Sequence, residues 1–138
     1  MILADTGYWV ALFDRDDHHH ARAVEVSRGL HEQLAVTWPV LTETVYFLGA
    51  RYGSAAVQRF LELGERGGYQ LHPLDEHDLP RLRALIKKYA DLPMDLAAAS
   101  LVLLAERTGE GRIFSTDQRD FRTYRFKQHK PFRNLLLG

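Results

Sequence analysis

Short apolar runs alternate with longer segments of helical periodicity along the chain, and this alternation most constrains the fold. The strand candidates are residues 2–4, 34–37, 69–74 and 112–115. The helix candidates are residues 8–13, 20–30, 39–52, 54–66, 75–89 and 93–107. Strands separated by helices predict a sheet of mainly parallel strands that is covered on both faces. The expected fold class is therefore α/β, as a three-layer α/β/α arrangement around a central, mainly parallel sheet.

The C-terminal part of the chain has a weaker pattern. Residues 116–121 follow the last clear strand candidate and are expected to form a loop or a short helix. Residues 131–137 are predicted to add a strand at one edge of the sheet.

Length and composition narrow the class of protein. A chain of 138 residues suits one domain, residues 1–138. Lys plus Arg and Asp plus Glu both number 18, which excludes a strongly basic nucleic-acid coat but not a local basic patch. The absence of Cys excludes a disulfide framework and a thiolate metal site. Without a signal-peptide pattern or a bilayer-length apolar run, we expect a cytoplasmic protein with no membrane partner.

The segment Asp5-Thr6-Gly7 has two interpretations. It matches the active-site loop of an aspartic protease, and it also matches a buried strand whose end presents a carboxylate to a metal. The protease requires an almost wholly β chain, so the helical segments nearly exclude it. In a parallel sheet, functional sites gather at the carboxyl ends of the strands, where Asp5 and Asp117 are expected.

Four carboxylates stand out because they occur in or beside apolar segments. They are Asp5, Glu43, Asp95 and Asp117. Each also has a purely structural interpretation. Asp5 and Asp117 could cap helices, Glu43 could lie at an exposed helix edge, and Asp95 could favour the positive end of a helix dipole. The segment around Glu43 is apolar nearly all round, which predicts a buried helix.

A group of carboxylates is unstable unless protons or a cation neutralise it. Mg²⁺ and Mn²⁺ prefer oxygen ligands, and such an ion can activate water and hold a phosphodiester. The sequence therefore predicts a site for Mg²⁺ or Mn²⁺.

Four segments carry a family resemblance: ILADTGYWVALFDRDD, TETVYFL, KYADLPMDLAAASLVLLAER and RIFSTDQRDFRTYR. In this order and spacing, the chain resembles the PIN-domain ribonucleases, and most of all the VapC-type toxins of bacterial toxin–antitoxin pairs. The resemblance implies a PIN-like α/β/α fold and cleavage of RNA that depends on Mg²⁺ or Mn²⁺. It also implies an antitoxin partner, a homodimer, and a structured RNA substrate such as tRNA.

The resemblance also implies roles for individual residues. Asp5 matches the first acid of the family and Glu43 the acid on the long helix. Asp117 matches the acid of the last segment, with Thr116 beside it as a hydroxyl residue that supports the cluster. Thr6 matches a small polar position after the first acid.

Ala98 departs from the family pattern, because relatives usually carry a metal-site Asp at this position. Asp95 is present one turn nearer the N-terminus. Three explanations are open: Asp95 replaces the missing carboxylate, the chain is a natural variant with weakened metal binding, or Ala98 was introduced to silence a toxic enzyme. Two functions follow, a ribonuclease toxin that is active, weakened or inactivated, and a non-catalytic module that binds RNA or an antitoxin.

Basic and aromatic side chains crowd the C-terminal third. The basic ones are Arg112, Arg119, Arg122, Arg125, Lys127, Lys130 and Arg133, interleaved with Tyr124, Phe126 and Phe132. This pattern predicts either a surface for the RNA backbone beside Asp117 or a solvated edge.

Overall fold

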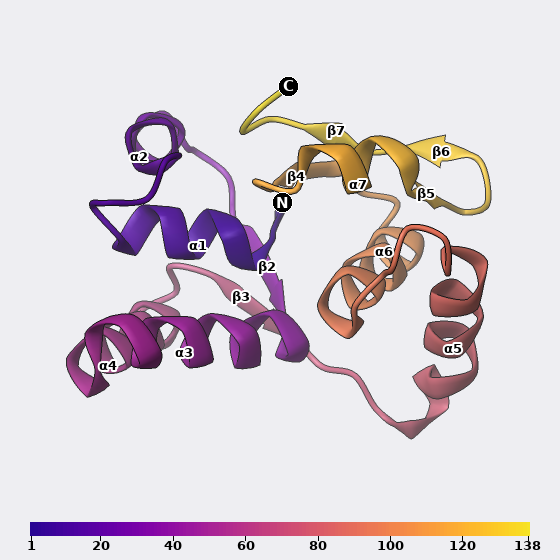
Figure 1. Cartoon of the computed structure of the whole chain (residues 1–138), viewed down its shortest axis with the longest axis horizontal. Coiled ribbons are helices and arrows are strands. Elements are labelled where there is room, and N and C mark those ends of the chain that lie inside the picture. The colour runs from indigo at the N-terminus through magenta and orange to yellow at the C-terminus, as the bar shows by residue number, and fades with distance from the viewer.

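A five-stranded sheet forms the centre of the computed structural model, which describes residues 1–138 (Figure 1). Its strands lie in the order β3-β2-β1-β4-β7, and every neighbouring pair is parallel. Their bounds are β1 Ile2–Ala4, β2 Leu34–Thr37, β3 Gln70–His72, β4 Arg112–Phe114 and β7 Arg133–Asn134. A separate antiparallel ribbon pairs β5 Arg125–Phe126 with β6 Lys130–Pro131.

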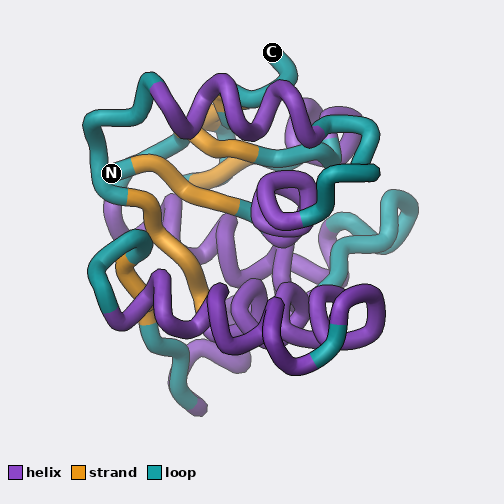
Figure 2. Tube along the Cα trace, turned by 90° about the vertical axis from the view of Figure 1, so that its left-hand side faces the viewer, coloured by secondary structure: helices purple, strands orange, loops and turns teal.

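Helices flank the sheet on both sides. They are α1 Thr6–Phe13, α2 His20–Arg28, α3 Trp38–Tyr52, α4 Ser54–Glu65, α5 Leu79–Lys88, α6 Leu96–Thr108 and α7 Gln118–Thr123. In Figure 1, α1 and α2 lie on one side of β1 and β2, and α5 and α6 lie on the other. Figure 2 shows the strands side by side between helices above and below. The predicted α/β/α arrangement with a parallel sheet is confirmed.

Burial on both faces explains why the central strands are continuous apolar runs. Every residue of β1 and β2 is buried, as expected for a parallel sheet between two helical layers. Beside this sheet, the ring of Trp9 lies edge-on to Phe60 and Tyr69, with centroids 5.4 and 5.2 Å away. These contacts fix α1 against α4 and the start of β3. The first turn of α1, directly after Asp5, is therefore held by the core.

Most predicted element boundaries are confirmed within one or two residues. The strands at 2–4 and 34–37 agree fully, and the helix predicted at 39–52 begins one residue earlier, with Pro39 in its first turn. The segment 75–89 begins as a 3₁₀ turn, Glu76–Asp78, before α5. None of the helices combines the length and the apolar character that crossing a membrane requires.

Two predicted boundaries are wrong. The helix predicted at 93–107 begins at Leu96, because the Asp95 side chain accepts a hydrogen bond from the Ala98 N–H at 2.8 Å and caps the helix there. The edge strand predicted at 131–137 is reduced to β7. The side chain of Asn134 accepts a hydrogen bond from the Leu136 N–H at 3.0 Å, which turns the chain out of the strand.

Candidate active site

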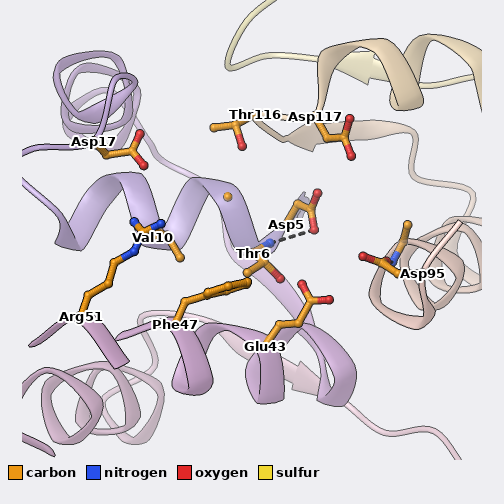
Figure 3. A pocket seen from close by; sticks show the side chains of 12 residues that line it. Asp5, Thr6, Val10, Asp17, Glu43, Phe47, Arg51, Asp95, Thr116 and Asp117 are labelled. Carbon is orange, nitrogen blue, oxygen red and sulfur yellow. Dashed lines mark hydrogen bonds between the residues drawn. The ribbon is translucent and has the colours of Figure 1, made fainter. Parts of the chain in front are cut away.

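The predicted acids line one cavity of about 350 Å³ beyond the carboxyl ends of β1 and β4 (Figure 3). Its lining residues include five carboxylates and one guanidinium: Asp5, Asp17, Glu43, Asp95, Asp117 and Arg51. Thr6, Thr116 and Ala98 also line it. The structure thus brings together all the site residues that the sequence predicted, although they come from four separate segments.

Asp5 both caps a helix and faces the cavity. One carboxylate oxygen, Oδ1, accepts a hydrogen bond from the Thr6 N–H at 2.8 Å, so it caps α1. The other, Oδ2, accepts one from the Ser115 hydroxyl at 3.0 Å. The pKa of Asp5 is raised to about 7, mainly by burial and to a smaller extent by the charges of Asp95 and Glu43. The cap interpretation of Asp5 is therefore confirmed, and its position at the cavity leaves the metal-site interpretation as a prediction.

Ser115 makes hydrogen bonds to both Asp5 and Asp117, and the sequence pattern did not predict it. It is fully buried directly after β4, and its hydroxyl oxygen also accepts a hydrogen bond from the Asp117 N–H at 2.9 Å. The family resemblance pointed to Thr116 as the supporting hydroxyl, but Ser115 makes these two contacts. A serine at the end of a buried strand was the only available sequence signal.

Glu43 reaches the cavity from the second turn of α3 (Figure 3). Burial raises its pKa, and the charge of Asp95 adds to the effect. The predicted burial of the helix on all sides is wrong, since the side chains of Tyr46 and Phe47 are 69% and 38% exposed. The neighbouring helices α1, α4 and α6 pack against only part of its surface.

Asp117 occupies the N-cap position of α7, but its side chain makes no capping hydrogen bond. Its carboxylate instead lines the cavity. Burial raises its pKa to about 6, with a further contribution from the neighbouring Asp120. The helix-cap interpretation is therefore not needed for Asp117.

Asp95 and Ala98 lie on the first turn of α6, on the side that faces the cavity. Asp95 is the N-cap residue, so its carboxylate accepts a hydrogen bond from a backbone N–H of the first helical turn while it also faces the other acids. Ala98 is 8% exposed and lines the cavity without adding a polar atom.

The donor atoms of this cavity suit a hydrated divalent cation. Carboxylates are preferred ligands of Mg²⁺ and Mn²⁺, and the hydroxyl of Thr6 is buried at the cavity without a hydrogen-bond partner. No three acidic or histidine side chains converge into a ready-made ligand set. Mg²⁺ commonly keeps several of its waters, so carboxylates that are spaced around a cavity are compatible with such an ion.

Gly7 allows the loop after β4 to approach α1 closely. A Cβ atom on Gly7 would lie 1.9 Å from the Thr116 hydroxyl oxygen, far inside van der Waals contact. This contact explains the glycine of the Asp5-Thr6-Gly7 segment without a protease, because Asp5 ends a parallel strand and Gly7 lies in a helix.

Replacing Gly7 with Ala is expected to push Thr116 away and to move the adjacent Asp117. We expect a loss of about 1–3 kcal/mol in the free energy of unfolding, and weaker cleavage of RNA, the reaction that the family resemblance implies. Thermal unfolding and a cleavage assay measure the two effects. Gly29→Ala is the matched control, because a Cβ atom on Gly29 would meet nothing within 4 Å. Equal behaviour of the two variants would contradict the role given to this contact.

The basic C-terminal third is only partly available to a ligand. The guanidinium of Arg112 is paired with Glu32 and Glu110, at 2.6 and 2.8 Å. Arg125 donates to the carbonyl oxygen of Arg122 at 2.8 Å. The side chain of Arg119 is 81% exposed and lies two residues after Asp117. The predicted basic surface is therefore smaller than the count of basic residues implies.

Comparison with known proteins agrees with this fold. VapC26, a ribonuclease of Mycobacterium tuberculosis, is 27% identical over 124 residues, which are 90% of this chain and 92% of that protein. The crystal structure of M. tuberculosis VapC20, described as a sarcin–ricin loop cleaving toxin, superposes with a TM-score of 0.78 at 16% identity. That match covers 87% of this chain and 94% of VapC20. The family model of the PIN domain matches residues 2–127, so the chain belongs to the PIN domain family.

Proposed function

We propose that this protein is an endoribonuclease that depends on Mg²⁺ or Mn²⁺ and is the toxin of a bacterial toxin–antitoxin pair. The observation that carries the proposal is the shared cavity, in which Asp5, Glu43, Asp95 and Asp117 face one another. Such a concentration of negative charge repels RNA unless a cation neutralises it. The raised pKa values of Asp5, Glu43 and Asp117 express the same repulsion and desolvation.

In this proposal the four carboxylates would hold the ion, and the Thr6 hydroxyl would be available to bind one of its waters. The bound ion would supply an activated water and neutralise charge on the phosphodiester. The Ser115 hydroxyl donates a hydrogen bond to the Asp5 carboxylate and accepts one from the Asp117 N–H. It therefore orients the Asp5 side chain and holds the backbone of Asp117. It is thus a positioning residue for both acids.

Cleavage of a labelled RNA by the purified protein tests the proposal. We expect cleavage in Mg²⁺ or Mn²⁺, its loss in EDTA, and its return when excess metal is added. Cleavage that persists in EDTA would contradict metal dependence. A Glu43→Gln variant that cleaves like the wild type would contradict the site.

A second candidate function is a module that binds RNA or an antitoxin without cleaving. Ala98 favours it, because the cavity lacks a carboxylate at a position where the family usually has one. Binding of RNA without cleavage at any metal concentration would support this second function.

The proposed partners rest on the resemblance to VapC proteins. They are a structured RNA such as tRNA, a cognate antitoxin and a second copy of the chain in a homodimer. We also propose a cytoplasmic location and a single domain over residues 1–138. One hydrophobic core that includes residues from Ile2 to Leu136 supports the single domain.

A further inference from the structure

The cavity has two chemically different ends. The four proposed metal-site acids lie at one end. Arg51, the only basic side chain that lines the cavity, lies at the other end, where the carboxylate of Asp17 also lines it. Glu43, Phe47 and Arg51 are four residues apart along α3, so they form one stripe on the same side of the helix. At a rise of about 1.5 Å per residue, the stripe extends about 12 Å from Glu43 to Arg51. Figure 3 shows all three side chains directed from α3 into the cavity.

A buried carboxylate holds the Arg51 guanidinium in place. Asp14 is 5% exposed and accepts a hydrogen bond from Arg51 Nη1 at 3.0 Å. Asp14 also accepts hydrogen bonds from the Tyr52 hydroxyl and from the Asp16 N–H. The side chain of Arg51 stays 49% exposed. Because a guanidinium carries five N–H donors, Arg51 keeps donors free for an anion after it binds Asp14.

Phe47 places an accessible aromatic face between the acids and Arg51. Its side chain is 38% exposed at the cavity, whereas most large apolar side chains of the chain are in the core. Aromatic faces of this kind stack on unpaired bases, and a nearby cation binds the phosphate backbone.

We propose that Phe47 and Arg51 form a subsite for one nucleotide of a single-stranded RNA segment, in which the base stacks on Phe47 and a phosphate pairs with Arg51. The inference rests on the proposed function and adds two residues that position the RNA in the same site. The stripe positions this nucleotide beside the acids, so the neighbouring phosphodiester enters the proposed metal site. Single-stranded loops of a folded RNA would meet this requirement, whereas paired bases would not expose a face for stacking.

Fluorescence anisotropy of a short, unstructured, labelled RNA tests the subsite. We would measure it in Mg²⁺ with an Asp5→Asn background, which preserves the RNA during the titration. Phe47→Leu keeps the apolar character but removes the stacking face, and we expect binding to weaken about tenfold. Arg51→Gln is expected to weaken binding about fivefold and to reduce the slope of log affinity against log salt by about 0.7. Arg51→Lys should restore most of that slope.

Two matched controls lie outside the cavity. Trp38→Leu removes an exposed ring from the first turn of α3, and Arg59→Gln removes an exposed charge from α4; neither residue lines the cavity. Both should leave RNA binding unchanged. If Arg51 only stabilises Asp14, Arg51→Gln should lower the melting temperature without changing the slope of log affinity against log salt. This result would overturn the subsite.

Cleavage assays separate the subsite from the proposed function. In the wild-type background, a raised KM with little change in kcat for both variants supports the subsite. If the wild type cleaves RNA and both variants match their controls, the subsite is wrong while the ribonuclease proposal stands. If the wild type does not cleave but binding still depends on Phe47 and Arg51, the subsite stands and the cleavage proposal fails.

Discussion

Replacing Asp5 with Asn is expected to abolish RNA cleavage and also to stabilise the metal-free protein above neutral pH. The substitution removes the carboxylate nearest the core, and a loss of at least about 1,000-fold in rate is expected if it binds the ion. Asn keeps the size of the side chain and an oxygen that can accept the Thr6 N–H bond. The fold should therefore not suffer from the substitution.

The sign of the stability effect follows from the pKa of Asp5. In the folded protein this pKa is raised to about 7, from an unfolded value near 3.8. Between these pH values the folded state binds more protons than the unfolded state, so the stability of the wild type falls as the pH rises from about 4 to 7. In a rigid site the wild type would lose at most about 4 kcal/mol of stability over this pH range. Because the site can relax around the ionised carboxylate, we expect a loss of about 1–3 kcal/mol.

Chemical denaturation of both proteins in EDTA measures this difference. At pH 8 Asp5→Asn should be the more stable protein, and the difference should vanish below about pH 3, where Asp5 is protonated in both states. If Asp5→Asn is less stable than the wild type at pH 8, the ionised Asp5 carboxylate does not destabilise the folded state.

Replacing Ala98 with Asp is expected to strengthen metal binding and cleavage while weakening the metal-free fold. Residue 98 lines the cavity one turn after Asp95, so the new carboxylate would add a ligand and also repel its neighbours. The N-terminal end of the α6 dipole offsets about 0.3–1 kcal/mol of that repulsion. We expect Mn²⁺ affinity and cleavage rate to rise at least about tenfold.

The melting temperature distinguishes the two effects of this substitution. Ala98→Asp should melt below the wild type in EDTA and above it in saturating Mn²⁺. Ala98→Asn is the matched control, since it has nearly the same shape without the charge. If Ala98→Asp and the wild type bind Mn²⁺ equally, Asp95 already supplies the carboxylate that Ala98 lacks.

The sequence predicts the sheet well because its central strands are buried on both faces. In β1 and β2 this burial requires every residue to be apolar or small, which leaves a local signal with clear ends. The strand β7 has no such signal. Its end depends on Asn134, whose side chain accepts the Leu136 N–H and is held in place by a hydrogen bond to the carbonyl oxygen of Ser115, 19 residues away. A contact between such distant residues leaves no pattern along the chain.

The candidate site was predictable in part for the same reason. Asp5 and Asp117 could be placed at strand ends from the expected topology, and Glu43 stood out as a single charge in an apolar helix. The family resemblance added the importance of position 98. Ser115 and Arg51 were missed because their partners, Asp5 and Asp14, lie 110 and 37 residues away. A hydroxyl or a guanidinium acquires such a role only when the fold brings its partner close.

Calorimetric titration of Mn²⁺ into the wild type and into Asp5→Asn tests the claim on which the proposed function depends. The claim is that Asp5, Glu43, Asp95 and Asp117 surround one divalent cation. It predicts a binding heat in the wild type that saturates and that is lost in Asp5→Asn, while both proteins keep the same circular dichroism spectrum. Equal heats in the two proteins, or no binding by the wild type, would contradict the claim.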